Sequence, residues 1–126
     1  MNQGVSLSVT IAEAAKLAEQ IRQAEVVYMV GGDTATLVSA LRAVPNITEL
    51  LIGKTLAGSS AGAYALVKYY RDNDTAKLGE GLGLLNIKVF AHFSPSVLPE
   101  YNELAQYQEN LPIIALPEGE WVRLES

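Results

Sequence analysis

One serine and one histidine dominate the chemistry that this chain could perform. Ser60 is the central residue of Gly58-Ser59-Ser60-Ala61-Gly62, which follows the apolar run Thr55-Leu56-Ala57 and precedes a stretch typical of a helix over residues 61–70. Strand, sharp turn and helix in this order are the pattern of a nucleophile elbow, which holds the serine on the turn. Glycines are expected on both sides because the turn brings backbone segments together and a Cβ would clash. The pattern predicts an exposed serine hydroxyl at the carboxyl edge of a sheet.

A serine hydroxyl becomes a good nucleophile only when a positioned base removes its proton. His92 is the only histidine of the chain, and the pKa of an imidazole suits this task near neutral pH. A carboxylate would orient the imidazole and stabilise its charged form. Glu118, which follows the apolar run 112–116, is the first candidate, and Asp74 and Asp72 are the second candidates because their loop could fold over the site.

Two backbone amides are candidates for binding the oxyanion that such a reaction creates. The Ala61 amide follows the serine directly at the start of the helix, and Gly32 follows the apolar run 26–30. A glycine there lets the backbone approach a substrate closely. Each feature also has a purely structural interpretation: a tight turn for the glycines, a structural histidine, a turn residue at Glu118, a solvated loop at the two aspartates. Their joint occurrence favours a site.

Composition excludes several other functional classes. The 126 residues fit one domain, residues 1–126, with a single core. The net charge of −5 gives no support for a nucleic-acid or anionic-membrane partner. The chain has no cysteine and one histidine, so neither a thiolate nor a His-rich metal site is expected, and no cofactor is implied. Without a signal-peptide pattern or a run of about 20 apolar residues, a cytoplasmic protein is expected.

Apolar runs alternate with helical patterns, which predicts an α/β domain with a mostly parallel sheet flanked by helices. The run 26–30 is apolar throughout, as is typical of a strand covered on both faces. A capping box over residues 10–13 marks the first helix. Strands are expected at 26–30, 55–57, 87–91, 112–116 and 121–124, and helices at 11–21, 36–42, 48–52, 61–70 and 103–108. Functional groups of such sheets gather beyond the carboxyl ends of the strands, where the candidates above all fall.

Four motifs together resemble those of the peptidase E family. They are Val30-Gly31-Gly32-Asp33-Thr34, Gly58-Ser59-Ser60-Ala61-Gly62-Ala63, Ala91-His92-Phe93 and Leu116-Pro117-Glu118-Gly119-Glu120-Trp121. The family comprises serine aspartyl dipeptidases with a class I glutamine amidotransferase-like fold, a flavodoxin-like sandwich. Over residues 10 to 124, the resemblance implies a triad of Ser60, His92 and Glu118, in a chain order that differs from that of α/β-hydrolases. It also implies oxyanion donors at the Gly32 and Ala61 amides, with Asn73 and Asp74 as accessory candidates.

The chain departs from this family in two ways. Family members carry further N-terminal strands and helices, so this chain is expected to be an N-terminally short member or a fragment. A sheet without those strands exposes an edge or an apolar face, and we expect a homo-oligomer, a dimer, or a partner chain to cover it. The family also recognises an N-terminal aspartate partly through basic residues after the histidine, but residues 93–116 contain no Lys or Arg and carry Glu100, Glu103 and Glu109. An acidic rim favours a substrate amine or a basic side chain.

The leading hypothesis is a serine hydrolase that cleaves dipeptides or short peptides. One alternative is a catalytically inactive binding or assembly module that keeps the elbow as a structural turn. Another is an amidase or esterase that acts on a small molecule through the same triad. Hydrogen-bond contact between Ser60 and His92 would favour an enzyme, whereas a His92 ring turned into the core would favour the module.

Overall fold

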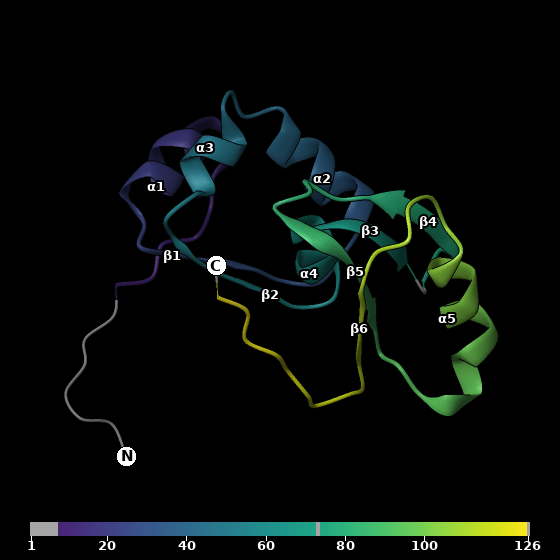
Figure 1. Ribbon diagram of the computed structural model, residues 1–126. Coiled ribbons are helices and arrows are strands. Elements are labelled where there is room, and N and C mark those ends of the chain that lie inside the picture. Colours follow the sequence, from purple (N-terminus) through teal and green to yellow (C-terminus); the bar gives the residue numbers. More distant parts are fainter. Residues whose placement is uncertain (1–7, 73, 126) are drawn as a thin grey trace, which may run out of the picture.

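The computed structural model describes residues 8–72 and 74–125, in which strands and helices alternate along the chain (Figure 1). The strands are β1 (Val26–Met29), β2 (Thr55–Gly58), β3 (Val67–Asp72), β4 (Lys77–Glu80), β5 (Leu85–Ala91) and β6 (Ile113–Leu116). The α-helices are α1 (Leu17–Gln23), α2 (Thr34–Arg42), α3 (Ile47–Leu51), α4 (Ala61–Leu66) and α5 (Leu98–Ala105), with short 3-10 helices at Ala14–Lys16 and Pro95–Val97. None of these helices is long and apolar enough to cross a membrane.

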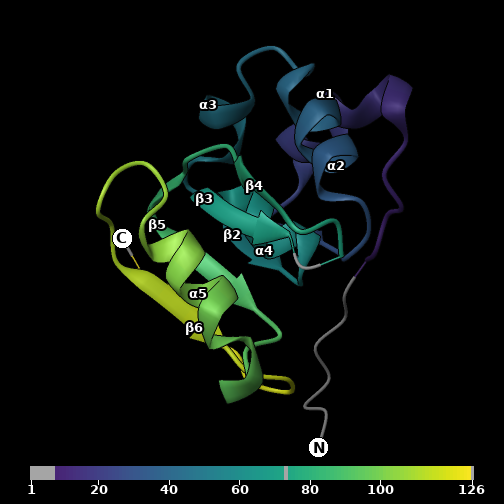
Figure 2. The ribbon, with the colours of Figure 1, turned by 90° about the vertical axis from the view of Figure 1, so that its right-hand side faces the viewer.

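The strands of the described residues belong to two hydrogen-bonded sheets. Strands β1 and β2 pair in parallel, and the other four strands lie in the order β4-β3-β5-β6. The pairs β3–β5 and β5–β6 are parallel, and only the edge strand β4 is antiparallel. Helix α5 lies over one face of the four-stranded sheet (Figure 2). The prediction of a mostly parallel α/β fold with flanking helices is confirmed, and it is consistent with a flavodoxin-like, class I glutamine amidotransferase-like fold.

The four-stranded sheet is buried on both faces. Alternate side chains of β5 point to opposite sides: Phe90 is fully buried and clusters with Leu104 of α5, whereas Val89 clusters with Tyr64 of α4. Lys88 is also fully buried, and its Nζ donates to the carbonyl oxygens of residues 104, 105 and 107, at 2.9, 3.2 and 2.6 Å. Burial lowers the pKa of Lys88. One lysine thus joins the end of α5 to the middle of the sheet.

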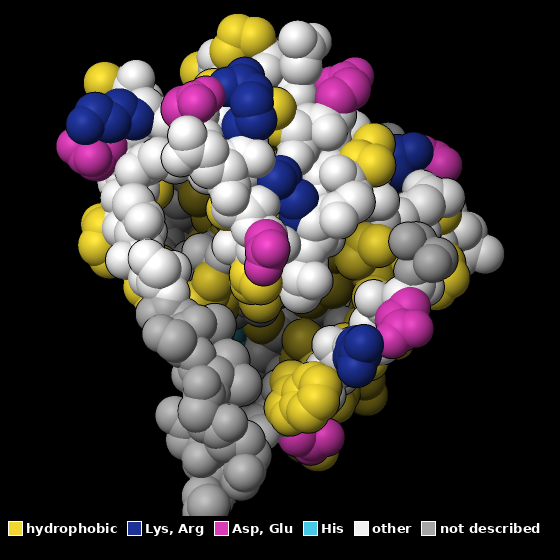
Figure 3. All heavy atoms as spheres, turned by 90° about the vertical axis from the view of Figure 1, so that its left-hand side faces the viewer, with side chains coloured by type: hydrophobic (Ala, Val, Ile, Leu, Met, Phe, Trp, Pro, Cys, Tyr) yellow, Lys and Arg dark blue, Asp and Glu magenta, His cyan; other side chains and the backbone are white. Residues whose placement is uncertain are grey.

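The two-stranded sheet is covered on one face only, contrary to the prediction for residues 26–30. Met29 is 5% exposed and packs with the helices, whereas Val26 and Tyr28 are 58% and 63% exposed. Val26 and Tyr28 lie on the side of β1 opposite Met29, and the described residues leave that side largely uncovered. Figure 3 shows hydrophobic side chains around and inside a hollow on this side of the molecule.

The capping box predicted over residues 10–13 does not form. Helical structure begins at Ala14, and the α-helix itself begins at Leu17. The side chain of Gln20 replaces the capping box: its Oε1 accepts from the backbone N–H of Glu13 at 2.8 Å, and its Nε2 donates to the carbonyl of Ile11 at 3.1 Å. These two hydrogen bonds hold residues 11–13 outside the helix, and the Ile11 side chain is exposed.

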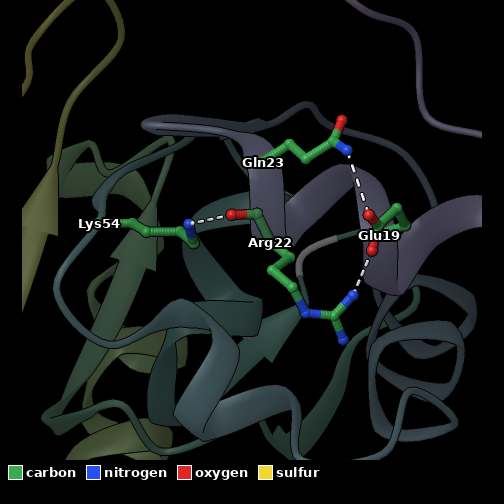
Figure 4. A network of polar contacts seen from close by, with 4 residues as sticks. All are labelled: Glu19, Arg22, Gln23 and Lys54. Atoms are coloured by element: carbon green, nitrogen blue, oxygen red, sulfur yellow. Dashed lines mark hydrogen bonds and ion pairs between the residues drawn. The ribbon is translucent and has the colours of Figure 1, made fainter.

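The end of α1 is secured by polar contacts (Figure 4). Gln23 and Arg22 both donate to the carboxylate of Glu19 one turn earlier. Lys54, from the loop before β2, donates to the carbonyl oxygens of Arg22 at 3.3 Å and Ala24 at 2.6 Å. A cation at the carboxyl end of a helix satisfies unpaired carbonyls and complements the helix dipole. These contacts fix the start of β2, the strand that leads to the serine turn.

Three further sequence predictions need correction. The helix predicted over 61–70 ends at Leu66, and residues 67–72 form β3. No strand forms at 121–124, whereas β4 was not predicted. The helix expected at 103–108 is α5, which starts earlier, at Leu98. The chain can turn sharply from α4 into β3 because Gly81 packs against this corner: a Cβ there would lie 2.2 Å from the Tyr64 carbonyl oxygen.

Candidate active site

The three side chains predicted to form a triad each follow a different parallel strand. Ser60 lies just after β2, His92 just after β5 and Glu118 just after β6. All three strands end at the same side of the molecule, as parallel strands do in α/β folds. The site therefore brings together residues from both sheets, with the serine from one and the other two side chains from the other.

The side chains of Ser60, His92 and Glu118 form a continuous chain of polar contacts. The Ser60 Oγ lies 3.2 Å from His92 Nε2, and His92 Nδ1 contacts Glu118 Oε1. A carboxylate on Nδ1 favours the tautomer with its proton there, which leaves the Nε2 lone pair free to accept from the serine O–H. Glu118, rather than Asp72 or Asp74, is the carboxylate that meets the imidazole among the described residues.

The turn that carries Ser60 is tightly built. Ser60 has φ 53° and ψ −110°, a strained conformation for a residue with a side chain. The predicted role of the flanking glycines is confirmed: a Cβ on Gly58 would lie 2.5 Å from the carbonyl carbon of Gly62, and one on Gly62 would lie 2.0 Å from the carbonyl oxygen of Met29. The backbone N–H of Ser59 also donates to Met29, at 3.0 Å. The turn is thus clamped between β1 and α4.

The imidazole of His92 is accessible to a solute and is not turned into the core. Its side chain is 48% exposed, and that of Glu118 is 77% exposed. His92 has a positive φ of 56°, which turns the chain sharply at the end of β5. The three side chains thus lie at the surface, where a substrate could reach them.

The two amides proposed as oxyanion donors flank the serine. Ala61 is the first residue of α4, so its N–H has no partner inside the helix. Gly32 has φ +144°, a backbone conformation that residues other than glycine rarely adopt. Its neighbour Gly31 approaches the serine closely, since a Cβ there would lie 3.5 Å from Ser60 Cβ. The glycine turn after β1 therefore packs directly beside the candidate nucleophile.

A small cavity of about 10 Å³ lies beside Ser60. Its walls include two side chains that sequence reasoning missed, Thr34 and Tyr64, together with Gly32, Ser60, Asp72, Asp74 and His92. Tyr64 stands four residues after the serine on α4, and this i, i+4 spacing is the signal that could have found it. Asp74 therefore lies near the site, as expected, whereas Asn73 lies outside the described residues.

The buried walls of this cavity are polar. Thr34 is 1% exposed, and its Oγ1 has no hydrogen-bond partner among the described residues. Tyr64 is 2% exposed, and burial raises its pKa to about 12. Asp72 Oδ1 accepts from the backbone N–H groups of Asp74 at 2.9 Å and Thr75 at 3.2 Å. Across the described part of the chain, no three His, Asp or Glu side chains are grouped so as to hold a metal ion.

The sequence also matches a protein-family model. The model described as Peptidase family S51 matches residues 3–126. The chain belongs to peptidase family S51. Membership confirms the resemblance to the peptidase E family and supports a serine peptidase of the peptidase E type. A search of curated proteins found no match to the chain, and neither did a search of solved structures.

In this S51 chain the site also opens onto a much larger cleft of about 1240 Å³. Strands β2, β5 and β6 and residues 121–125 form its walls, and the side chains of Ser60, His92 and Glu118 lie on its lining. Leu56, Ile87 and Ile114 give it a partly apolar surface. The candidate nucleophile of the S51 chain therefore stands between a very small polar cavity and a wide, partly apolar cleft.

Proposed function

We propose that this chain is a serine peptidase that cleaves dipeptides or short peptides, with Ser60 as nucleophile, His92 as general base and Glu118 as the carboxylate that orients His92. The observation that carries the proposal is the unbroken chain of contacts from Ser60 Oγ through both ring nitrogens to Glu118. Family membership supports a peptide substrate over an ester. The exposure of the imidazole argues against an inactive module with a structural histidine.

The reaction follows from the roles of these groups. Ser60 Oγ attacks the carbonyl carbon of the scissile bond while His92 Nε2 takes its proton, and the amides of Gly32 and Ala61 hold the oxyanion. Collapse of the tetrahedral intermediate breaks the C–N bond, and His92 gives its proton to the leaving amine. Water then attacks the acyl-enzyme with His92 as base, and the protonated His92 returns a proton to the serine oxygen. Glu118 stabilises the imidazolium in both halves of the reaction.

The proposal is tested by hydrolysis of a mixed dipeptide panel, followed by mass spectrometry, with Asp-X, Lys-X and neutral N-terminal residues. Ser60→Ala removes the nucleophile, and we expect kcat to fall by about 10⁴- to 10⁶-fold. Ser59→Ala is the matched control, because it removes a neighbouring hydroxyl from the same turn, and kcat should change by only a few-fold. Equal activity of wild type and Ser60→Ala would contradict the proposal. Hydrolysis of p-nitrophenyl esters but of no dipeptide would favour the esterase.

We also propose that two copies of the chain pair through the exposed face of β1 and β2. The support is the apolar surface that Val26 and Tyr28 of β1 expose there, at 58% and 63%. Apolar faces and open strand edges of this kind are commonly covered by a partner. Sedimentation velocity should show a dimer, and Tyr28→Lys should shift it to monomer without unfolding it. A monomer at all concentrations would contradict this pairing.

A further inference from the structure

We infer that Tyr64 is a positioning residue: it holds the hydroxyl of Ser60 and the imidazole of His92 at the separation that proton transfer requires. The inference rests on the proposed function and adds to the triad a residue outside it. A general base must lie within hydrogen-bond reach of the proton it takes, and the two partners here follow strands of different sheets. Three observations on Tyr64 carry the inference: its link to the serine turn, its contact at the end of β5, and the missing partner of its phenol oxygen.

Tyr64 is joined to the serine turn by its backbone and to the four-stranded sheet by its side chain. It lies one helical turn after Ser60 on α4, and its backbone N–H donates to the Ser60 carbonyl at 3.0 Å. Its ring stacks on that of Tyr70 in β3, with the ring centroids 5.1 Å apart and the planes at 14°. The buried side chain also clusters with Val89 and Ala91 of β5. A shift of Tyr64 would therefore move the serine relative to the strand that precedes His92.

The phenol oxygen of Tyr64 reaches the end of β5. Burial raises the pKa of Tyr64 to about 12, and the backbone N–H of Ala91 is the group that lowers it most, so this amide lies beside the phenol oxygen. Ala91 is the last residue of β5 and directly precedes His92. Tyr64, Ser60 and His92 also line the same small cavity. The phenol therefore stands between the serine turn and the peptide that carries the base.

His92 needs such a support because its backbone conformation is unfavourable. Its φ of 56° lies in the left-handed region, which residues with a Cβ adopt at a cost. Ser60, its partner in the contact, is strained as well, with φ 53°. Such conformations persist only where the surrounding structure holds them. The phenol packs against the peptide before His92 and so limits how far this turn can relax away from the serine.

The phenol oxygen is retained at a cost to stability. It is buried, and among the described residues it has no hydrogen bond of ordinary geometry. A buried hydroxyl without a partner is unfavourable, whereas an apolar group of the same shape in its place can be neutral or stabilising. Phenylalanine would keep the ring and its stacking on Tyr70 without this cost. A tyrosine at this position therefore indicates a role in the site rather than in packing.

Tyr64→Phe tests this role because it removes only the phenol oxygen. We expect kcat for dipeptide hydrolysis to fall by about tenfold or more while KM stays close to that of the wild type, since the base is displaced and the substrate is not. Tyr70→Phe is the matched control: it makes the same change in the stacked ring, whose hydroxyl lies at Gly79 of β4, and kcat should change little. Equal falls in the two variants would overturn the inference. A rise in KM with kcat unchanged would assign Tyr64 to substrate binding and would overturn it as well.

Urea unfolding of the same variant separates positioning from packing. The free energy of unfolding of Tyr64→Phe should equal or exceed that of the wild type, because a buried oxygen without a partner is lost. Lower activity at undiminished stability is the result that a positioning role predicts. A stability that falls together with kcat would show that the phenol serves the fold, and it would overturn the inference.

Nuclear magnetic resonance reads the contact between serine and imidazole without any substrate. His92 is the only histidine of the chain, so a single Nε2 resonance reports on the site. Ser60→Ala should shift this resonance clearly in the wild type and by less than about half as much in Tyr64→Phe, as a double-mutant cycle shows for coupled residues. Tyr64→Phe changes no charge near neutral pH, because the pKa of Tyr64 is about 12, and it leaves the carboxylates of Glu118, Asp72 and Asp74 in place.

The outcomes of this cycle separate the inference from the proposed function. Equal shifts in the two backgrounds would overturn the role of Tyr64 and leave the triad standing. Failure of the proposed function would appear elsewhere, as hydrolysis that persists in Ser60→Ala. A smaller shift in Tyr64→Phe would support the positioning role even if the wild type cleaved no dipeptide of the panel.

Discussion

The two sheets of the molecule differ in how well they are packed, and the candidate site draws on both. In the four-stranded sheet Phe90 is fully buried, whereas in the two-stranded sheet Tyr28 is 63% exposed. Ser60 follows β2 of the lightly covered sheet, and His92 follows β5 of the well-packed one. Helix α4 contacts β1, β2, β3 and β5. The 3.2 Å contact between serine and imidazole therefore depends on α4, which joins the two differently packed sheets.

The largest effect on stability is expected in the four-stranded sheet. Phe90→Ala removes a fully buried ring that meets the rings of Phe93 and Tyr101. The cavity left behind should lower the free energy of unfolding by about 3–5 kcal/mol, measured by urea denaturation. A loss below 1 kcal/mol would show that this half of the molecule is packed no better than the other.

Gly62→Ala tests the close packing of α4 against β1, which positions the serine turn. Its Cβ would lie 2.0 Å from the Met29 carbonyl oxygen, and this backbone atom cannot move aside cheaply. We expect a loss of about 3 kcal/mol in unfolding free energy and a larger relative loss of peptidase activity, since the serine turn must shift.

Gly31→Ala is the control for this junction, because its Cβ would meet only ordinary contacts at 3.5 Å or more. Thermal unfolding and dipeptide hydrolysis should both remain close to those of the wild type. If the two variants behave alike, the clamp between β1 and α4 does not set the position of the serine.

Lys88→Met probes the polar link inside the well-packed half. The substitution leaves three carbonyl oxygens at the end of α5 without their buried donor, and we expect a loss of about 2 kcal/mol. Lys77→Met, at an exposed position at the start of β4, is the control and should change the unfolding free energy by less than about 0.5 kcal/mol. A more stable Lys88→Met variant would mean that desolvation of the ammonium outweighs its three hydrogen bonds.

The smallest effect is expected on the lightly covered half. Tyr28→Ala removes a side chain that is 63% exposed, so the unfolding free energy of a monomer should change by less than about 0.5 kcal/mol. A concentration-dependent loss well above this value would contradict this expectation, because it would show that a second copy buries this face in solution.

The sequence predicted the order of most elements because apolar runs such as 26–30 and 112–116 have strand length and helical patterns separate them. It failed at 67–70, where Val-Lys-Tyr-Tyr reads equally well as either state. Antiparallel pairing with the adjacent β4 and parallel pairing with β5 make this segment a strand, and the residue types of 67–70 alone record neither partner. The capping box failed for a similar reason, since Gln20 competes for the Glu13 amide.

The residues of the candidate site that belong to a sequence motif could be predicted, whereas those that tertiary packing brings to the site could not. Glycine spacing around Ser60 and the single histidine indicated the polar residues that could react. The cavity was not foreseen, because Thr34 and Tyr64 are ordinary helix residues until the fold closes around them. The sequence also failed to predict that β1 is covered on one face only. An apolar run indicates that a segment can be buried, but not whether another element is present to cover it.

The distance along the chain between the residues of the candidate site has a consequence for how the protein folds. The contacts of His92 with Ser60 and Glu118 join residues 32 and 26 positions apart. Contacts of such separation require large loops to close, which costs conformational entropy and slows folding. In a folding intermediate that contains only the local helices, His92 would not yet be in contact with Ser60. Hydrolysis would therefore begin when long-range assembly is complete, and the appearance of activity during refolding would time the docking of the two sheets.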